Sequence, residues 1–360
     1  MSLLSGALCP GCLRELEVGS AVEEIACAGC RQIYPRVAGI PVLLPHPERH
    51  VGLWRKQLGL LLERGQRTLA ALTDTAGEAR LTPATRARLN ALAQAVNNQV
   101  DDLASILGPA LGGAAAAAGA GLPRGVVEYI GYLYRDWGWP AAGYRENDLA
   151  LAELAQLLGA AGLARMLVLG AGACGLATEL HLRHGARETV AIDIDPYLLV
   201  IAEQLVRGGN VPLTEASVKY IEAGDVSRQW LLKSASVPLR REVFRCVFAD
   251  GLAPPFAPES FDTVVTPWFI DQVVRDLPAF LCTLRRLLRP GGRWVNQGPL
   301  VYTEQTPFER RYAREELFEL AGAAGFEVDG WTRSSHRYLV SPLTGNGKIE
   351  SVLSFVATRR

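Results

Sequence analysis

The stretch Met166-Leu167-Val168-Leu169-Gly170-Ala171-Gly172-Ala173-Cys174-Gly175 decides the fold of this chain. Its first four residues predict a buried strand, and Gly170, Gly172 and Gly175 then let the backbone turn tightly and approach a ligand closely. In folds with such a loop, an acid about 20 residues further on accepts hydrogen bonds from ribose hydroxyls. Asp193, at the end of the next predicted strand, has this spacing. The pattern predicts a cofactor that carries a nucleoside, although a tight turn followed by a helix-capping aspartate would look the same.

The chain from Asp148 onward alternates between strand and helix patterns. Repeated strand–helix units predict an α/β fold with a parallel, doubly wound sheet. Gly345-Asn346-Gly347 lies between two extended runs and predicts a terminal hairpin that adds one antiparallel strand. The predicted strands are Met166–Leu169, Thr189–Ile194, Val243–Phe248, Phe261–Thr266 and Arg293–Asn296, and the predicted helices include Leu149–Leu158, Leu176–His184, Tyr197–Val206 and Glu315–Ala324.

The segment before this domain reads as interrupted helices. Apolar residues recur at helical spacing from Leu53 to Leu62 and again from Leu89 to Leu107. The segment ends in an aromatic-rich run, Glu128 to Asn147, which either packs helices together or forms a lid over the cofactor. We therefore expect three regions, an N-terminal module over residues 1–48, a helical linker or lid over 49–147, and the cofactor-binding domain over 148–360.

Four of the seven cysteines stand in two pairs, Cys9 with Cys12 and Cys27 with Cys30, separated by fourteen residues. This spacing is typical of a tetrathiolate zinc site, which leaves no open coordination position for catalysis. Redox-active dithiols or an iron–sulfur site would use the same residues. A module of this size buries little core, so we expect structural Zn²⁺ to hold it together.

The residues that follow the second cysteine pair resemble a known family. Tyr34-Pro35 and Gly39-Ile40-Pro41-Val42-Leu43-Leu44 are similar to the tail of Trm112-like zinc ribbons. Members of that family are partners or fused modules of methyltransferases. The resemblance implies a zinc ribbon that packs against a catalytic domain or binds a protein partner.

Composition limits the classes of protein that remain. The chain has 360 residues, 49% of them hydrophobic, and 37 basic residues balance 37 acidic ones. A net charge near zero makes bulk capture of nucleic acid unexpected. Metal-bound thiolates and the lack of a signal-peptide pattern in Met1–Leu8 predict a cytoplasmic protein. Leu103–Leu122 is long enough for a membrane span, but Ala and Gly carry little transfer free energy. Its Gly-Pro and Gly-Gly pairs interrupt a helix, so we expect a linker or loop.

The glycine loop alone does not separate a nicotinamide dinucleotide from S-adenosylmethionine, because both contain adenosine. Asp250 ends the run Val247-Phe248-Ala249-Asp250, and Leu287–Gly292 forms a turn before a later strand. Both features resemble class I methyltransferases, which have a Rossmann-like sheet with an antiparallel last strand. That resemblance implies S-adenosylmethionine as the methyl donor and Asp250 as a contact to the adenine amine.

Three further segments resemble the carnosine N-methyltransferase family. They are Arg135-Asp136-Trp137 with Arg145 following, Phe269-Ile270-Asp271, and Trp294–Tyr302, which reads Trp-Val-Asn-Gln-Gly-Pro-Leu-Val-Tyr. The resemblance covers residues 130–302. It implies that methyl transfer goes to the nitrogen of an imidazole.

The same resemblance implies a role for each site residue. Arg135 would hold the methionine carboxylate, Asp193 the ribose, and Asp271 the substrate imidazole, with Tyr302 beside it in the substrate segment. A carboxylate that accepts the imidazole N–H fixes the tautomer and supports the positive charge that develops on the ring. The alternative for Asp271 is a cap of the following helix.

This chain departs from the family pattern at several positions. Thr303 stands where the family has a histidine that contacts substrate, Cys174 where it has the third loop glycine, and 348–356 lacks an obvious match to its tyrosine. The departures predict an acceptor other than carnosine.

Four functions remain open at this point. The favoured one is methylation of a histidine-like nitrogen in a small molecule or peptide. The alternatives are a methyltransferase for a protein or RNA docked by the ribbon, an NAD-dependent dehydrogenase, and a scaffold without catalysis. The acids Asp193, Asp250 and Asp271 count against a scaffold, and few basic residues in the ribbon count against RNA.

Overall fold

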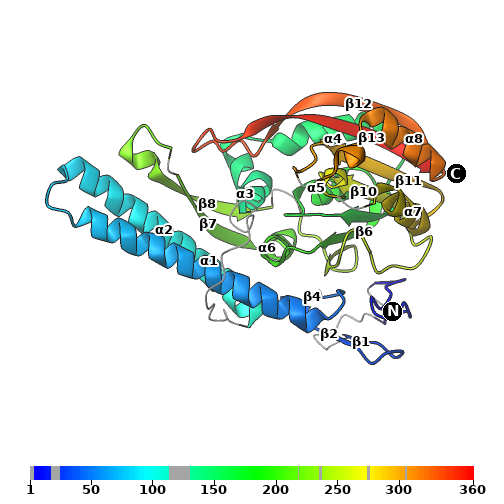
Figure 1. Cartoon of the computed structure of the whole chain (residues 1–360), viewed down its shortest axis with the longest axis horizontal. Helices are drawn as coiled ribbons and strands as arrows, with labels where there is room; N and C mark the ends of the chain where they lie inside the picture. Colours follow the sequence, from blue (N-terminus) through cyan, green and yellow to red (C-terminus); the bar gives the residue numbers. More distant parts are fainter. Residues whose placement is uncertain are drawn as a thin grey trace.

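The computed structural model describes residues 4–17, 25–112, 130–217, 219–234, 237–273, 276–304 and 306–360. Its centre is a seven-stranded sheet in the order β12–β13–β11–β10–β5–β6–β9 (Figure 1). Strand β13 runs in the direction opposite to the other six. The predicted doubly wound sheet with one antiparallel strand in a terminal hairpin is therefore confirmed. Its strands are β5 (Ala164–Leu169), β6 (Ala186–Asp193), β9 (Phe244–Phe248), β10 (Phe261–Pro267), β11 (Leu288–Gly298), β12 (Phe326–Tyr338) and β13 (Lys348–Arg359).

Both faces of this sheet are buried. Side chains alternate along a strand, so β5 directs Met166 and Val168 into one core and Leu167 and Leu169 into the other. Helices from α4 to α6 contribute to the first core, and α7 and α8 to the second. Their bounds agree closely with the predicted helices: α4 (Glu146–Leu158), α5 (Gly175–Arg183), α6 (Pro196–Val206), α7 (Leu277–Leu287) and α8 (Arg314–Ala323).

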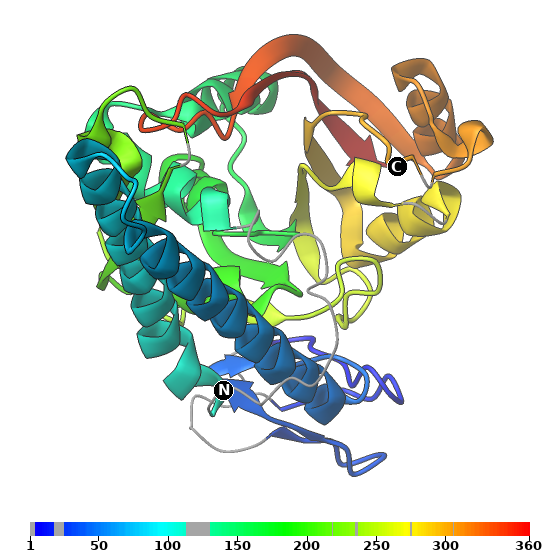
Figure 2. The ribbon, with the colours of Figure 1, turned by 60° about the vertical axis from the view of Figure 1, so that its left-hand side comes forward.

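The N-terminal module covers a part of the sheet where a helix is missing. No helix occurs between β9 and β10, and Ala7 forms a bridge with Phe256 of that connection. Leu43 N donates to Phe248 O at 2.8 Å, which extends the sheet beyond its edge strand β9. Figure 2 shows this module in dark blue beneath the sheet. Its own strands are short: β1 (Ile25–Ala26), β2 (Ile33–Tyr34), β3 (Arg36–Val37) and β4 (Ile40–Pro41).

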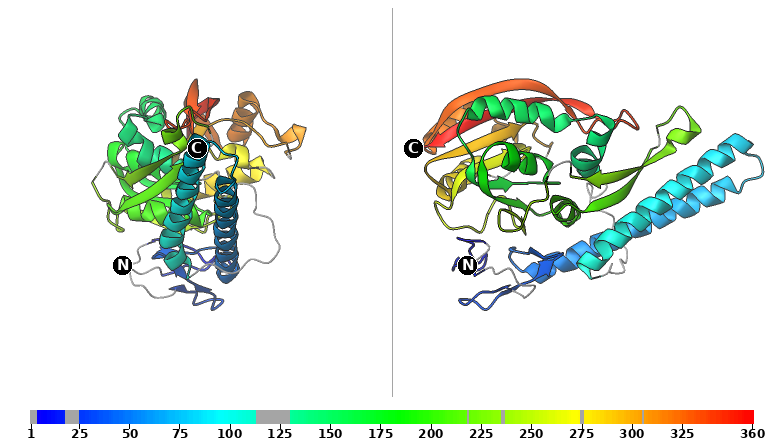
Figure 3. Two further views of the ribbon diagram at one scale, coloured as in Figure 1. Left: turned by 90° about the vertical axis from the view of Figure 1, so that its left-hand side faces the viewer. Right: turned by 180° about the vertical axis from the view of Figure 1, so that it is seen from behind.

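A long antiparallel helix pair follows this module. Helices α1 (Pro47–Ala76) and α2 (Pro83–Leu111) reach well past the sheet, and the hairpin β7 (Asn210–Ala216) and β8 (Ser227–Lys233) packs against α2 (Figures 1 and 3). The Asp102 carboxylate fixes this contact by accepting from both Thr214 N and Thr214 Oγ1, at 2.9 and 2.8 Å. The sequence did not predict the hairpin, because Pro212 interrupts the pattern expected of a strand.

The prediction of a loop over Leu103–Leu122 is wrong for its first part. Helix α2 continues through Pro109 to Leu111, since Leu103, Leu107 and Leu111 recur at four-residue spacing and are all buried. The remainder, residues 113–122, lies outside the described residues. Within the described ranges, no helix combines the length and the apolar character that crossing a membrane requires.

The bond between Leu43 and Phe248 provides a test of how far the module supports the sheet. Proline at 43 removes the donor and leaves a buried carbonyl without a partner, which costs about 1–3 kcal/mol. We expect Leu43→Pro to lower the free energy of unfolding by that amount beyond Leu43→Ala, which loses the same side-chain packing. Urea unfolding measures both variants, and equal midpoints would contradict the expectation.

Candidate active site

A cavity of about 690 Å³ opens at the carboxyl ends of the parallel strands. Ligands bind at this edge in open α/β sheets, where strand order reverses. The glycine loop after β5, the acids after β6 and the loop after β10 form its floor. Residues from α1, from the segment 132–147 and from the β12–β13 hairpin complete its walls. The cavity brings together Arg135, Gly170, Gly172, Asp193 and Asp271 of the predicted site residues.

One buried carboxylate, Asp136, holds the glycine loop in place. Its Oδ2 accepts from Gly175 N at 2.9 Å, and its Oδ1 accepts from Arg135 Nε at 2.7 Å and from Asn147 Nδ2 at 2.9 Å. A Cβ on residue 175 would lie 2.4 Å from Asp136, so only glycine allows this approach. Gly175 thus anchors the loop through its backbone N–H and does not line the cavity.

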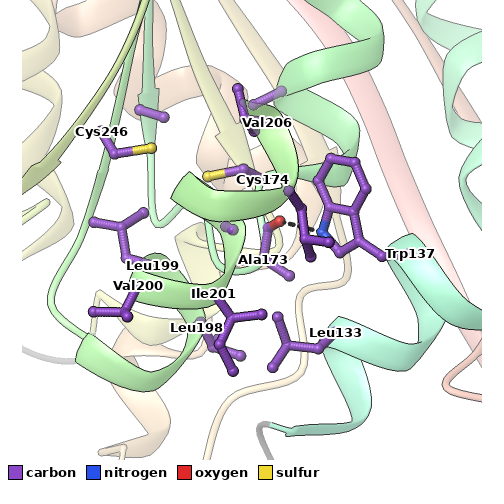
Figure 4. Close-up of a cluster of buried hydrophobic side chains, with 14 of the residues drawn as sticks. Leu133, Trp137, Ala173, Cys174, Leu198, Leu199, Val200, Ile201, Val206 and Cys246 are labelled. Atoms are coloured by element: carbon purple, nitrogen blue, oxygen red, sulfur yellow. Dashed lines mark hydrogen bonds between the residues drawn. The ribbon is translucent and has the colours of Figure 1, made fainter. Parts of the chain in front are cut away.

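The residues on either side of Asp136, Arg135 and Trp137, also contribute to this site, and we call the three residues the Asp136 clamp. Trp137 Nε1 donates to Ala173 O at 2.7 Å, from a buried position against α6 (Figure 4). Arg135 lines the cavity, and although burial opposes it, the Asp136 carboxylate raises the pKa of the guanidinium above its ordinary value. The three residues share the π-helical turn Tyr134–Gly138, which follows α3 (Ile130–Leu133). In the described part of the aromatic-rich run, Trp137 packs in the core while Tyr132 and Arg135 line the cavity.

Asp193 also binds the glycine loop. Its Oδ2 accepts from Gly172 N at 2.7 Å and its Oδ1 from Asp195 N at 2.8 Å, while the side chain lines the cavity. Burial raises the pKa of Asp193. Asp195 instead caps α6, accepting from Tyr197 N and Leu198 N at 2.8 and 3.0 Å. Both aspartates line the cavity, but Asp193 binds the glycine loop while Asp195 caps the helix.

Asp250 lies just beyond β9 and does not line the cavity. Its carboxylate accepts from Leu252 N at 2.8 Å. His50 of α1 lines the cavity. Burial lowers the pKa of His50, and the negative charge of Asp250 partly offsets this effect. Contact between Asp250 and an adenine amine stays a prediction.

Asp271 lines the cavity from the 3₁₀ turn Ile270–Gln272, which follows β10, on the other side of β5 from Asp193 and β6. Its side chain is buried, Gln272 Nε2 donates to it at 3.2 Å, and burial raises its pKa to about 6. The helix that follows is capped by Asp276, which accepts from Ala279 N. The capping alternative for Asp271 is therefore wrong.

Tyr302 lies near Asp271 but outside the cavity lining. Its hydroxyl donates to Tyr312 O at 3.2 Å, and burial raises its pKa to about 12. A direct role in catalysis therefore stays a prediction, and this bond would have to break before the hydroxyl could donate to a substrate.

Sequence reasoning missed several residues at the Asp271 end. Trp268 and Tyr338 lie with ring centroids 4.2 Å apart, and the Tyr338 hydroxyl bonds that of Tyr132. Lys348 forms an ion pair with Glu350 and holds its ammonium 5.1 Å from the Tyr338 ring. These residues come from segments far apart in sequence. The two-residue spacing of Lys348 and Glu350 on one strand was the one available signal.

The four paired cysteines form a cluster in which all sulfur atoms lie within 4.8 Å of one another. Cys9 and Cys30 are 3.5 Å apart, as are Cys12 and Cys27, and Tyr34 Oη bonds Cys9 at 3.0 Å. Sulfur atoms around a tetrahedral zinc ion are separated by about 3.7 Å. The donor set and spacing therefore fit the predicted metal.

Comparison with known proteins identifies the family. Residues 124–342 match the family model of carnosine N-methyltransferase. The chain belongs to this family. Its sheet has the strand order of the class I methyltransferase fold, and membership of this family counts against the dehydrogenase and scaffold alternatives.

Individual relatives share limited sequence identity with this chain. The carnosine N-methyltransferase of Schizosaccharomyces pombe is 34% identical over 83 residues, which cover 19% of this chain and 22% of that protein. Among solved structures, the complex of the Haloferax volcanii Trm112 methyltransferase activator with a methyltransferase gives a TM-score of 0.42 at 16% identity, covering 64% of this chain and 96% of that one. Phosphoethanolamine N-methyltransferase 2 of Haemonchus contortus with S-adenosyl-L-methionine gives 0.41 at 16%, covering 65% and 56%.

Asp136 holds the glycine loop without taking part in the reaction. Its substitution should therefore weaken binding of the methyl donor. Hydrogen bonds to a charged acceptor are worth about 1.5–3 kcal/mol and those to a neutral one about 0.5–1.5. We expect Asp136→Asn to weaken S-adenosylhomocysteine binding by roughly tenfold, measured by titration calorimetry. Asp148→Asn is the control, since Asp148 is half-exposed and lies 4.0 Å from Arg145. Equal affinities for the two variants would refute the clamp.

Proposed function

We propose that this methyltransferase methylates a ring nitrogen of a histidine-like imidazole in a small molecule or peptide. The observation that carries the proposal is Asp271, a buried carboxylate that lines the cavity on the other side of β5 from Asp193. Family membership supports N-methylation, and the aromatic rings of Trp268 and Tyr338 offer flat surfaces for a heterocycle.

The residues along the cavity divide into a donor half and an acceptor half. In the donor half, Arg135 would hold the methionine carboxylate and Asp193 the ribose hydroxyls, beside the backbone of Gly170 and Gly172. Asp250, which lies outside the lining just beyond β9, would reach the adenine amine. When bound, S-adenosylmethionine supplies an electrophilic methyl group on sulfur. The cationic Arg135 and the free lone pairs of Asp193 suit a ligand with a carboxylate at one end and hydroxyls at the other.

In the acceptor half, Asp271 governs the proton on the imidazole. A neutral imidazole has one N–H and one lone pair, so a carboxylate bonded to the N–H directs the lone pair toward the donor half. As the N–CH₃ bond forms, the S–CH₃ bond breaks and its electron pair stays on the sulfur of the departing S-adenosylhomocysteine. The ring becomes cationic, and the Asp271 carboxylate then stabilises the charge and can take the N–H proton. A carboxyl with a pKa near 6 is ionised at neutral pH and can still accept a proton.

The acceptor differs from carnosine in this proposal. Thr303 replaces the family's histidine, and Lys348 and Glu350 place a charged pair at the acceptor half, in the region where the family carries a tyrosine. A free imidazole compound or a histidine-containing peptide with other end groups fits these changes.

We further propose that Cys9, Cys12, Cys27 and Cys30 bind one structural Zn²⁺. The module contacts the catalytic sheet through Ala7 and Leu43, which supports a role in stabilising this chain in addition to any contact with a protein partner. A tetrathiolate site has no open position, so the metal takes no part in methyl transfer.

Metal analysis tests the zinc proposal. We expect one zinc per chain, lost when Cys9 and Cys12 are both changed to serine, together with a lower melting temperature because metal binding supplies folding free energy. Changing Cys282, an exposed cysteine outside the cluster, to serine should keep the metal. Iron in place of zinc, or a metal-free wild-type protein with full stability, would overturn the proposal.

Asp271→Asn tests the mechanism. The amide keeps the shape but cannot take a proton, and loss of one such positioned group costs roughly 2.7–4 kcal/mol, or 10²–10³ in turnover. Donor affinity should persist, because the donor-half residues are untouched. Turnover of the wild type should fall as the pH drops through about 6, where Asp271 becomes protonated. Full activity of the variant, or a product methylated on oxygen or carbon, would sink the mechanism.

The same variant should be more stable than the wild type. Burial favours the protonated carboxyl, so the folded state binds the proton more tightly and stability falls as the pH rises from 4 through about 6. Above pH 6, removing the charge should raise the free energy of unfolding by up to roughly 3 kcal/mol. Denaturant melts at pH 4 and pH 7.5 measure the difference, which should vanish at the lower pH. A variant less stable at both would contradict this account.

A further inference from the structure

One face of helix α1 lines the cavity. His50, Leu53, Trp54 and Gln57 all border it, and their spacing of three, four and seven residues places them on one side of the helix. Helix α1 lies outside residues 124–342, so the family match does not account for this wall. An apolar helical pattern was the one feature of this segment that could be read before the structure.

The wall stands at the donor half of the cavity. Among the other lining residues are Asp193, Ile194 and Asp195, which end β6 and lead into α6. Leu53 and Ile194 both border this cavity, and each keeps 49% of its surface exposed. An apolar, flat ligand between them would remove both from water.

Rigid contacts hold α1 in this position. Tyr197 Oη of α6 donates to Trp54 O at 3.1 Å, and the Trp54 ring lies 4.9 Å from that of Phe248 at the end of β9. Leu43, four residues before α1 begins, is hydrogen-bonded to Phe248. The helix is therefore fixed to the strand ends that border the donor half.

We propose that α1 forms the outer wall of the adenosine site, with Leu53 and Ile194 flanking the purine ring of the methyl donor. His50 and Gln57 flank Leu53 along the same helix face and supply hydrogen-bonding groups toward the purine edge. The inference extends the donor site to a helix that leads directly from the ribbon. It does not depend on the identity of the methyl acceptor.

The test uses two probes that differ in the amino-acid part. Methylthioadenosine carries the nucleoside alone, and S-adenosylhomocysteine carries the nucleoside and the methionine-like end. We expect Leu53→Asp to weaken both by at least tenfold in titration calorimetry. Arg135→Ala should weaken S-adenosylhomocysteine far more than methylthioadenosine, which separates the two ends of the site.

Leu231→Asp is the matched control, because Leu231 is 50% exposed on β8 and does not border the cavity. Leu53→Met should retain near-normal affinity, and Leu53→Ala, the milder change, should fall between the wild type and Leu53→Asp. The inference is overturned if Leu53→Asp binds methylthioadenosine no more weakly than Leu231→Asp. It is also overturned if Leu53→Ala binds as the wild type does.

Discussion

A largely parallel sheet has to be covered on both faces, and this requirement shapes the whole chain. Five helices cover most of it, but none connects β9 to β10. The N-terminal module packs there, bridges Ala7 to Phe256, and bonds Leu43 to the edge strand at Phe248. The module is thus part of the hydrophobic core of the catalytic fold. Because α1 begins directly after it, the same contact sets where α1 meets the cavity.

The site depends on buried carboxylates with distinct tasks. Asp136 satisfies three donors and is neutralised by Arg135, so its charge is compensated within the protein. Among the residues that the structure describes, none forms an ion pair with Asp271, and burial raises its pKa. A charge without a buried cation is costly to the folded state, and proteins keep such groups mainly where chemistry uses them. This contrast separates the residue that positions the loop from the one that faces the acceptor.

Sequence reasoning succeeded where the signal is local. The glycine loop, the spacing to Asp193 and the order of strands and helices all depend on neighbouring residues and short periods. It failed where partners are distant. Asp136 lies 39 residues from Gly175, and Leu53 comes to line the same cavity as Ile194 only once α1 folds back over the sheet. Leu103–Leu111 misled because Gly108 and Pro109 lower helix propensity, while burial of three leucines outweighs this cost.

The covering of β9 by the N-terminal module also bears on the order of folding. Leu43 and Phe248 are roughly 200 residues apart, and pairing between such distant segments is slow because a long loop must close first. During synthesis the module emerges well before its strand partner. Until the sheet forms, its apolar tail, Ile40 to Leu44, stays exposed to water or bound to a chaperone. A bound metal would keep the cysteine knuckles ordered during that interval.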